Sequence, residues 1–194
     1  FFFLICTLLY VIPLYLAVKK ILNKYWFYPF FFLVISLSFW GYGTNGLRNG
    51  IATSFFIYAI TRDDKKKIIA FLIIASLFHK SIYIPLLAYI ISLLYKKTKT
   101  YILIWFLAIP LSLALGSFWE GFFANLNLFD SDRLEGYLDG DEEFQEQFSS
   151  LGFRWDFLVY SATGVLSGWY FIIKKGFNDK YYKIFFNIYL ITNS

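Results

Sequence analysis

The chain has 194 residues, of which 59% are hydrophobic, 24% aromatic and only 16% charged, and its net charge is +5. Soluble domains are usually about 45–50% apolar and about 25% charged, so this composition argues against a soluble domain. The positive charge does not indicate nucleic-acid binding, because the basic residues form short clusters between apolar runs rather than one face. Since the sequence lacks Met and begins Phe1-Phe2-Phe3, we expect an internal fragment of a longer protein, forming a single membrane domain over residues 1–194.

Eight charge-free runs follow one another along the chain, at residues 1–18, 25–47, 49–61, 68–78, 81–95, 100–119, 157–173 and 184–194. A membrane-spanning helix needs about 20 apolar residues, with roughly 17–25 tolerated, and the first, second, sixth and seventh runs meet this length. The third to fifth runs are either spans completed by their polar ends or helices that stop inside the membrane around a wet cavity. Because membrane-spanning backbone must be helical or a closed barrel, and alternating strand patterns are absent, the sequence predicts an all-α, polytopic transmembrane helical bundle with about eight membrane segments.

The basic residues predict the orientation of these segments. Fourteen of the 18 Lys and Arg residues follow the first, third, fifth and seventh runs, and positive residues are retained in cytoplasmic loops. Alternating spans therefore put all the Lys-rich loops in the cytoplasm. Four cations remain for the outer side: Arg48, Lys80, Arg133 and Arg154.

The stretch 120–153 is the one long connection, and it carries nine of the 13 acidic residues. The orientation puts it outside the cytoplasm, as an extracytoplasmic loop. It is either a solvated loop or a lid over an outward cavity, because loops longer than about 12–15 residues are usually functional or disordered.

The arginines among the four outer cations are candidate site residues. Arg48 begins a short apolar run, and Arg154 lies at the start of the seventh run, beside Asp156. Arg in the hydrocarbon centre costs from about 2.5 to more than 10 kcal/mol, so such residues tend to face cavities. The alternatives are snorkelling to the headgroups and, for Arg154, a local ion pair with Asp156. Together they predict an outward site for an anion, since the planar guanidinium fits phosphate.

His79 is the only histidine in the chain, and it ends the fourth run just before Lys80. It is a candidate general base or phosphate ligand, or else an interfacial histidine bonded to water or a carbonyl. With one cysteine, Cys6, and no second histidine, a conventional metal site is not expected. We expect neither a metal nor a cofactor.

The segment from Gly41 to Gly46 matches the GxGxxG pattern of dinucleotide-binding proteins. That fingerprint requires a buried strand before it and a soluble βαβ unit around it, whereas an aromatic membrane run precedes it here. We interpret the glycines as a flexible turn that lets the chain re-enter the membrane at Arg48.

Four short motifs in order carry a family resemblance. They are Gly46-Leu-Arg48-Asn-Gly-Ile-Ala52, Leu77-Phe78-His79-Lys80-Ser81, Asp132-Arg133-Leu-Glu-Gly-Tyr137-Leu138 and Phe153-Arg154-Trp-Asp156-Phe157. The set, with its topology, resembles the exopolysaccharide polymerases of the EpsG type, which are bacterial relatives of the Wzy O-antigen polymerases.

The resemblance implies a membrane glycosyltransferase of GT-C-like architecture in the bacterial cytoplasmic membrane. Its implied reaction is the polymerisation, on the outer face, of polyprenyl-pyrophosphate-linked oligosaccharide repeat units into exopolysaccharide, capsule or O-antigen. The implied catalytic residues are Arg48, His79, Arg154 and Asp156, and the implied substrate-binding residues are Asn49, Lys80, Arg133 and Tyr137. Its partners would be the lipid-linked glycan, the bilayer, a chain-length regulator and other polysaccharide-assembly proteins. The alternatives are a lipid-linked glycan flippase or anion transporter, and a glycan ligase or acyltransferase.

Overall fold

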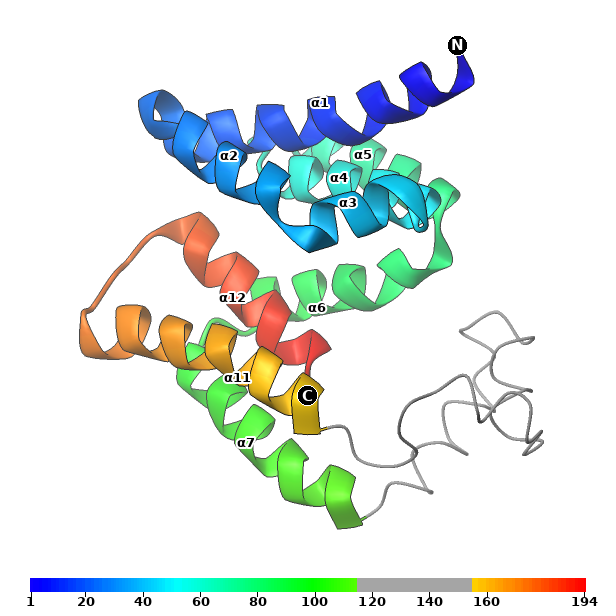
Figure 1. The fold of residues 1–194 in the computed structure, drawn as a ribbon. Helices are drawn as coiled ribbons and strands as arrows, with labels where there is room; N and C mark the ends of the chain where they lie inside the picture. Colours follow the sequence, from blue (N-terminus) through cyan, green and yellow to red (C-terminus); the bar gives the residue numbers. More distant parts are fainter. Residues whose placement is uncertain (115–154) are drawn as a thin grey trace, which may run out of the picture. The chain divides into compact units, whose positions relative to one another are not determined.

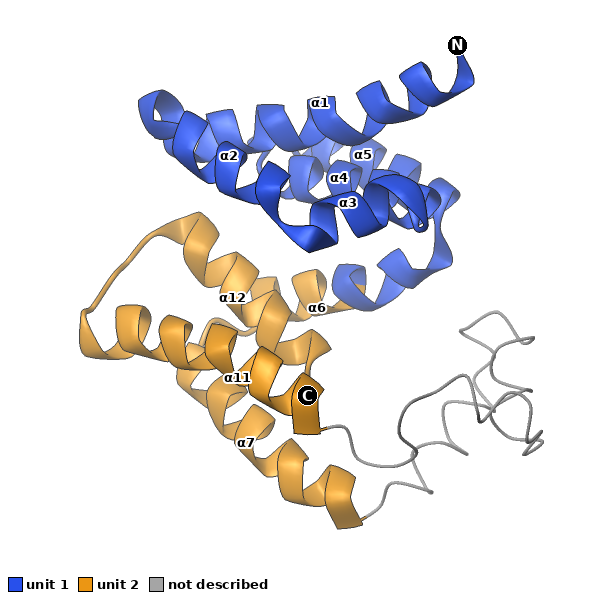
Figure 2. Ribbon diagram, in the orientation of Figure 1, with its two compact units in different colours: residues 1–86 blue, residues 87–194 orange. Residues whose placement is uncertain are grey.

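The computed structural model describes residues 1–114 and 155–194, which form nine α-helices and a few short helical turns, with no strand in these two ranges. The all-α prediction is confirmed. The helices group into two compact units, Phe1–Leu86 and Leu87–Ser194, which Figure 2 draws in different colours. The predicted loop at 120–153 lies outside the described residues.

The first unit begins with α1 (Phe2–Leu22), which buries one stripe of its surface. Its buried positions, among them Cys6, Tyr10 and Leu14, recur every three or four residues, as one face of a helix requires. Its last turn carries Lys19 and Lys20, whose charges are favourable at the negative end of the helix dipole. Together with the turn η1 (Asn23–Tyr25) it gives a helical stretch of 24 residues, Phe2–Tyr25, which is long and apolar enough to cross a membrane.

The second apolar run is broken, whereas the sequence predicts one continuous span. It forms α2 (Phe27–Ile35) and α3 (Leu37–Thr44), which are bent by 65° at Ser36. The Ser36 hydroxyl donates to the Leu33 carbonyl at 2.7 Å and accepts from the Phe39 amide at 3.3 Å, so it competes with the helical ladder. The flexible turn predicted over Gly41–Gly46 is also shorter than expected, because α3 continues through Gly41 to Thr44.

The centre of this unit is the helical hairpin of α4 (Leu47–Ile60) and α5 (Lys65–Phe78), with α1 packed along α4 (Figure 1). Asp64 caps α5, since its side chain accepts from the Lys66 amide at 2.9 Å. Small buried residues of α4, such as Gly50 and Ala52, let neighbouring backbones approach closely.

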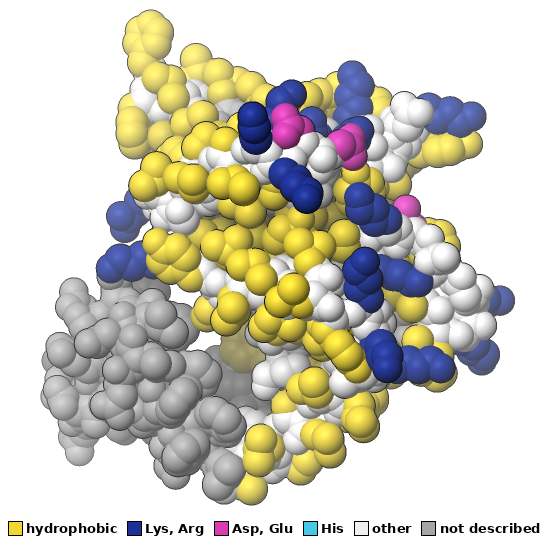
Figure 3. Space-filling view, turned by 180° about the vertical axis from the view of Figure 1, so that it is seen from behind, with side chains coloured by type: hydrophobic (Ala, Val, Ile, Leu, Met, Phe, Trp, Pro, Cys, Tyr) yellow, Lys and Arg dark blue, Asp and Glu magenta, His cyan; other side chains and the backbone are white. Residues whose placement is uncertain are grey.

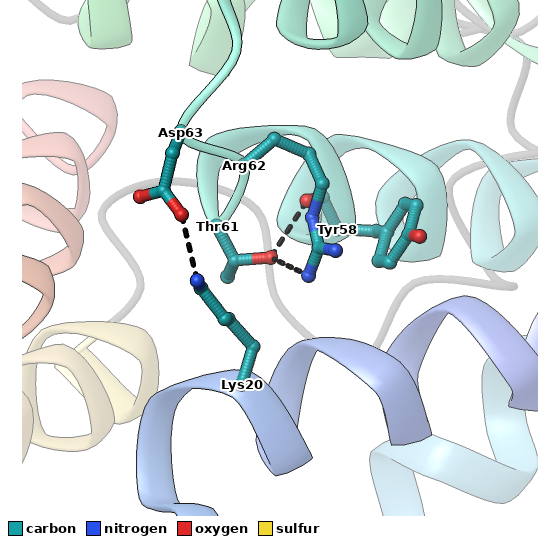
Figure 4. Close-up of polar contacts among 5 residues, drawn as sticks. All are labelled: Lys20, Tyr58, Thr61, Arg62 and Asp63. Atoms are coloured by element: carbon teal, nitrogen blue, oxygen red, sulfur yellow. Dashed lines mark hydrogen bonds and ion pairs between the residues drawn. The ribbon is translucent and has the colours of Figure 1, made fainter.

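The turn between α4 and α5 contacts the end of α1, as Figure 4 shows. Lys20 Nζ lies 2.6 Å from Asp63 Oδ2. Arg62 lies over the Tyr58 ring at 4.1 Å and donates to the Thr61 hydroxyl at 3.0 Å. Exposed ion pairs contribute only about 0–1 kcal/mol to stability. The Lys20–Asp63 pair therefore adds little to the stability of the unit, but it shows that the α4–α5 turn lies beside the end of α1. It brings two of the predicted cytoplasmic cation clusters to the same end of the unit.

The second unit comprises most of α6 (Tyr83–Leu94), then α7 (Thr98–Ala114), α11 (Trp155–Trp169), the π-helical turn η3 (Tyr170–Lys174) and α12 (Lys180–Thr192). Its core includes Tyr101, Trp105, Val165, Phe186 and Leu190. The helical stretch Trp155–Lys174 has 20 residues and is apolar enough to cross a membrane.

The prediction of about eight membrane crossings is not reproduced by the described helices. Two are long and apolar enough, or three if the bent pair α2–α3 is one span, while Lys80–Leu94 and Thr98–Ala114 are shorter apolar helices. Large apolar side chains such as Phe32, Leu94 and Tyr160 are exposed to more than 60%. Figure 3 shows a surface that is largely hydrophobic, with Lys and Arg side chains gathered in groups. The chain is therefore an integral membrane protein.

Gly50→Ala should destabilise the protein, because the added Cβ would lie 2.9 Å from the Tyr42 carbonyl oxygen and 3.2 Å from the Tyr10 ring. Overpacking of this kind typically costs about 1–3 kcal/mol. The measurement is thermal unfolding in detergent. The matched control is Gly41→Ala in α3, where nothing lies within 4 Å of the new Cβ and a helical alanine is favoured by about 0.5–1 kcal/mol. Equal loss of stability in both variants would contradict the packing of α4.

Candidate functional site

Two of the sequence motifs meet at one end of the α4–α5 hairpin. Arg48 and Asn49 lie in the first turn of α4, and His79 follows the last residue of α5. Lys80 and Ser81 come next, in the short 3-10 turn η2 (Lys80–Ile82), which contacts both helices. Because the helices of a hairpin run antiparallel, the start of α4 and the end of α5 share one end of the unit.

A polar network joins the two motifs across 32 residues of sequence. The Ser81 hydroxyl lies 3.0 Å from Asn49 Oδ1, to which it donates, and 2.7 Å from His79 Nδ1. The Ser81 amide also points at Nδ1, at 3.1 Å. All three side chains are partly buried. We call this cluster of Asn49, Ser81 and His79 the polar relay.

The backbone around His79 explains its position. α5 ends because His79 adopts an extended conformation, with φ −155° and ψ 135°. The residue before it, Phe78, stacks on Phe55 of α4, with ring centroids 5.9 Å apart and planes 7° apart. Aromatic pairs of this kind add about 0.5–1.5 kcal/mol beyond their area burial. The stacked pair therefore anchors the end of α5 on α4 directly beside the relay.

Two cations flank the polar relay. Arg48 precedes Asn49, Lys80 stands between His79 and Ser81, and both side chains are exposed. Neither has a hydrogen bond or an ion pair with any residue that the structure describes. The acidic residues of this unit, Asp63 and Asp64, lie at the other end of the hairpin. The end that carries the relay is therefore positively charged, which attracts anions.

The start of α4 adds to this positive end. Gly46 is the N-cap residue, and no side chain caps the helix. The first amide groups of a helix lack intrahelical partners and carry the positive end of its dipole, so they favour negative ligands. Arg48 extends from this same first turn.

The other predicted site residues lie in the second unit or outside the described residues. Asp156 is exposed in the first turn of α11, in the second unit. Arg133, Tyr137 and Arg154 lie outside the described residues. Because Arg48, His79 and Arg154 all lie at predicted outer ends of helices, the sequence predicts that they converge on one outward pocket, and this stays a prediction. Ser81 is the last residue of the second motif, but the sequence alone predicts no role for it.

A cavity of about 130 Å³ lies in the first unit. Its lining includes Tyr10, Ser36, Phe39, Tyr42 and Gly50, but neither Arg48 nor His79. It lies where the bend between α2 and α3 faces α1 and α4, and it holds a few hydroxyl groups among apolar walls.

The comparison with known families gives a match over the entire chain. The model of the EpsG family matches residues 1–194. The chain belongs to the EpsG family. The resemblance inferred from the motifs is thereby confirmed, and membership implies a part in exopolysaccharide biosynthesis. No curated protein and no solved structure matches the chain.

In this EpsG-family protein, the polar relay makes a direct prediction about proximity. Asn49→Cys and Ser81→Cys, introduced together after replacing Cys6 by Ser, should be joined in membranes by a short bifunctional thiol reagent. The control pair is Arg62→Cys with Ser81→Cys, at opposite ends of α5, whose 14 residues rise about 21 Å. Gel mobility after cross-linking and cleavage between the two sites reads the result. Cross-linking of the control pair alone would contradict the site.

Proposed function

We propose that this EpsG-family protein polymerises polyprenyl-pyrophosphate-linked oligosaccharide repeat units into exopolysaccharide on the outer face of the cytoplasmic membrane. The observation that carries the proposal is the polar relay, which holds His79 at one end of the α4–α5 hairpin with two exposed cations beside it. A lipid pyrophosphate is an anion that reaches a protein from within the bilayer. Family membership supports this substrate class.

The length of the hairpin supports a site at membrane depth. α4 and α5 have 14 residues each and rise about 21 Å, whereas the hydrocarbon core is about 30 Å thick. With Arg62 and Lys65 at the inner headgroups, the other end falls roughly 9 Å short of the outer boundary. Arg48 would then meet a pyrophosphate near the acyl boundary, where the polyprenyl chain holds it.

A polymerase site at this end of the hairpin must stabilise the negative charge of the pyrophosphate leaving group. When the bond between the anomeric carbon and the pyrophosphate breaks, negative charge grows on the phosphate oxygens. Donors placed where that charge develops lower the barrier. Arg48 offers two parallel N–H donors to one phosphate, and Lys80 and the uncapped start of α4 add positive potential beside it.

His79 and the remaining predicted residues take the other roles. His79 is the base for the attacking sugar hydroxyl or a phosphate ligand, and Asp156 is the competing base. Arg154 would hold the pyrophosphate, and Arg133 would clamp it or the glycan from the loop at 120–153. Asn49 and Tyr137 would contact the glycan. A chain-length regulator and other assembly proteins are the proposed partners.

A transporter of the lipid-linked unit is the second candidate, and one observation favours it. The pair α2–α3 is bent by 65° at Ser36, and helices broken within the membrane are typical of the binding sites of transporters. The polymerase is preferred because the cations and His79 lie together at one end of the α4–α5 hairpin rather than on the bent pair.

Arg48→Lys should abolish or shorten the polymer although it keeps the charge. Lysine offers a point charge on a flexible stem and cannot reproduce the planar fork, and loss of one such contact typically costs about 10²–10³ in rate. Single lipid-linked repeat units should accumulate on the outer face, where an impermeant glycan-labelling reagent detects them on intact cells. The matched control is Arg62→Lys, the same change at the other end of the hairpin, which should leave polymer length unchanged.

Units found only inside the cell in the Arg48→Lys strain would contradict the polymerase and favour the transporter. Normal polymer in that strain would remove Arg48 from the site.

A further inference from the structure

Basic residues gather where the end of α1 meets the turn between α4 and α5. The ion pair between Lys20 and Asp63, at 2.6 Å, joins these two segments (Figure 4). Together the segments carry seven cations, Lys19, Lys20, Lys24, Arg62, Lys65, Lys66 and Lys67, and two carboxylates, Asp63 and Asp64. This end of the first unit therefore has a large excess of positive charge.

Three of these cations are left without a partner. Lys65, Lys66 and Lys67 are exposed at the start of α5, and their side chains have no hydrogen bond, ion pair or ring contact with any residue that the structure describes. The two carboxylates are already engaged, one in the ion pair with α1 and the other as the cap of α5. A negative group shared by the three lysines would balance their charge.

An apolar stripe continues from these lysines along the same helix. It consists of Ile69, Ile73 and Leu77, which recur every four residues and are exposed to 59%, 54% and 79%. They follow Lys66 at three, seven and eleven residues, so all of them lie on one side of α5. The opposite side carries the fully buried Ala75 and packs on α4. The α5 stripe therefore faces away from α4.

The lysines and the α5 stripe have the dimensions of one leaflet of a bilayer. The helix rises about 16 Å from Lys66 to Leu77, and half of the hydrocarbon core is about 15 Å thick. A phospholipid has the same layout, with its phosphate at the boundary and an acyl chain that reaches the midplane. An anionic headgroup would also offset the excess charge, and basic clusters beside membrane helices attract such headgroups.

We propose that this face of α5 binds an anionic phospholipid of the leaflet that the predicted orientation makes cytoplasmic. The three lysines hold the headgroup, and one acyl chain lies along the α5 stripe. A free phosphate would meet the same lysines but gain nothing from the stripe, so we assign the site to a lipid. The polar relay lies at the other end of α5. Because the hairpin is short, a lipid held at this end would also set the depth of the relay in the membrane.

The test measures which lipid lies against the α5 stripe. In a Cys6→Ser background, Ile73→Cys is labelled with a fluorophore and reconstituted in phosphatidylcholine vesicles with a minor fraction of phosphatidylglycerol. Bromine atoms on the acyl chains of one lipid or the other quench the fluorophore on contact. Brominated phosphatidylglycerol should quench it at least about threefold more strongly per mole of lipid, since each basic residue favours anionic headgroups by roughly fivefold.

Ile5→Cys is the matched labelling site, because Ile5 is also exposed to 54% but lies 14 residues, or about 21 Å, before the first lysine of α1. Both lipids should quench it equally. Replacing Lys65, Lys66 and Lys67 together by Gln, whose helix propensity is similar, should abolish the preference at Ile73→Cys. Salt at about 1 M should weaken it, because the screening length falls to about 3 Å.

Equal quenching of labelled Ile73→Cys by the two lipids would overturn the inference, and so would a preference that survives the replacement of the three lysines. Replacing Lys96, Lys97 and Lys99 by Gln removes the same number of charges elsewhere and should leave the preference intact. An equal loss in that control would assign the preference to the overall charge and overturn the site. Quenching by neither lipid would show that protein covers this face, which would also overturn it.

Discussion

The close approach of α4 to its neighbours at Gly50 is the contact on which the site depends. Because Gly50 has no Cβ, the Tyr42 carbonyl oxygen and the Tyr10 ring pack closely against α4, where they would lie 2.9 Å and 3.2 Å from an added Cβ. This contact sets the position of the first turn of α4, and therefore the position of Asn49. The stacked rings of Phe55 and Phe78 fix the end of α5 on the same helix. Only with both contacts in place can Ser81 bridge the two motifs.

The cations at the two ends of the α4–α5 hairpin have different surroundings. At the turn between the helices, Lys20 has a carboxylate partner and Arg62 lies over an aromatic ring (Figure 4). At the relay end, Arg48 and Lys80 are exposed and have no partner within the described part of the chain. An uncompensated arginine is costly at membrane depth. A negatively charged substrate that arrives with its own lipid tail would offset that cost, which gives a physical reason for the asymmetry.

Much of this arrangement could be predicted from the sequence, because it depends on patterns that act over short distances. The apolar runs predicted helices, and the short hairpin predicted that Arg48 and His79 lie at the same end. The bend at Ser36 was missed, since both halves of that run are apolar and hydropathy carries no signal for a hydroxyl that competes with the helical ladder. The role of Ser81 was missed because its contact with Asn49 depends on the rotation of α4 and α5 about their axes. The described helices show two or three of the eight predicted crossings, because several of the apolar runs have only 11–15 residues and form helices shorter than a full span.

The central claim, that the relay end of the hairpin binds a lipid pyrophosphate, is tested most directly by ligand-induced stabilisation. A polyprenyl pyrophosphate added to the purified protein in detergent at 100 times its dissociation constant should raise the free energy of unfolding by about 2.7 kcal/mol. The corresponding monophosphate, at the same concentration, should raise it less. The account predicts that Arg48→Lys loses most of this stabilisation while Arg62→Lys keeps it. Equal stabilisation of both variants by the pyrophosphate would contradict it.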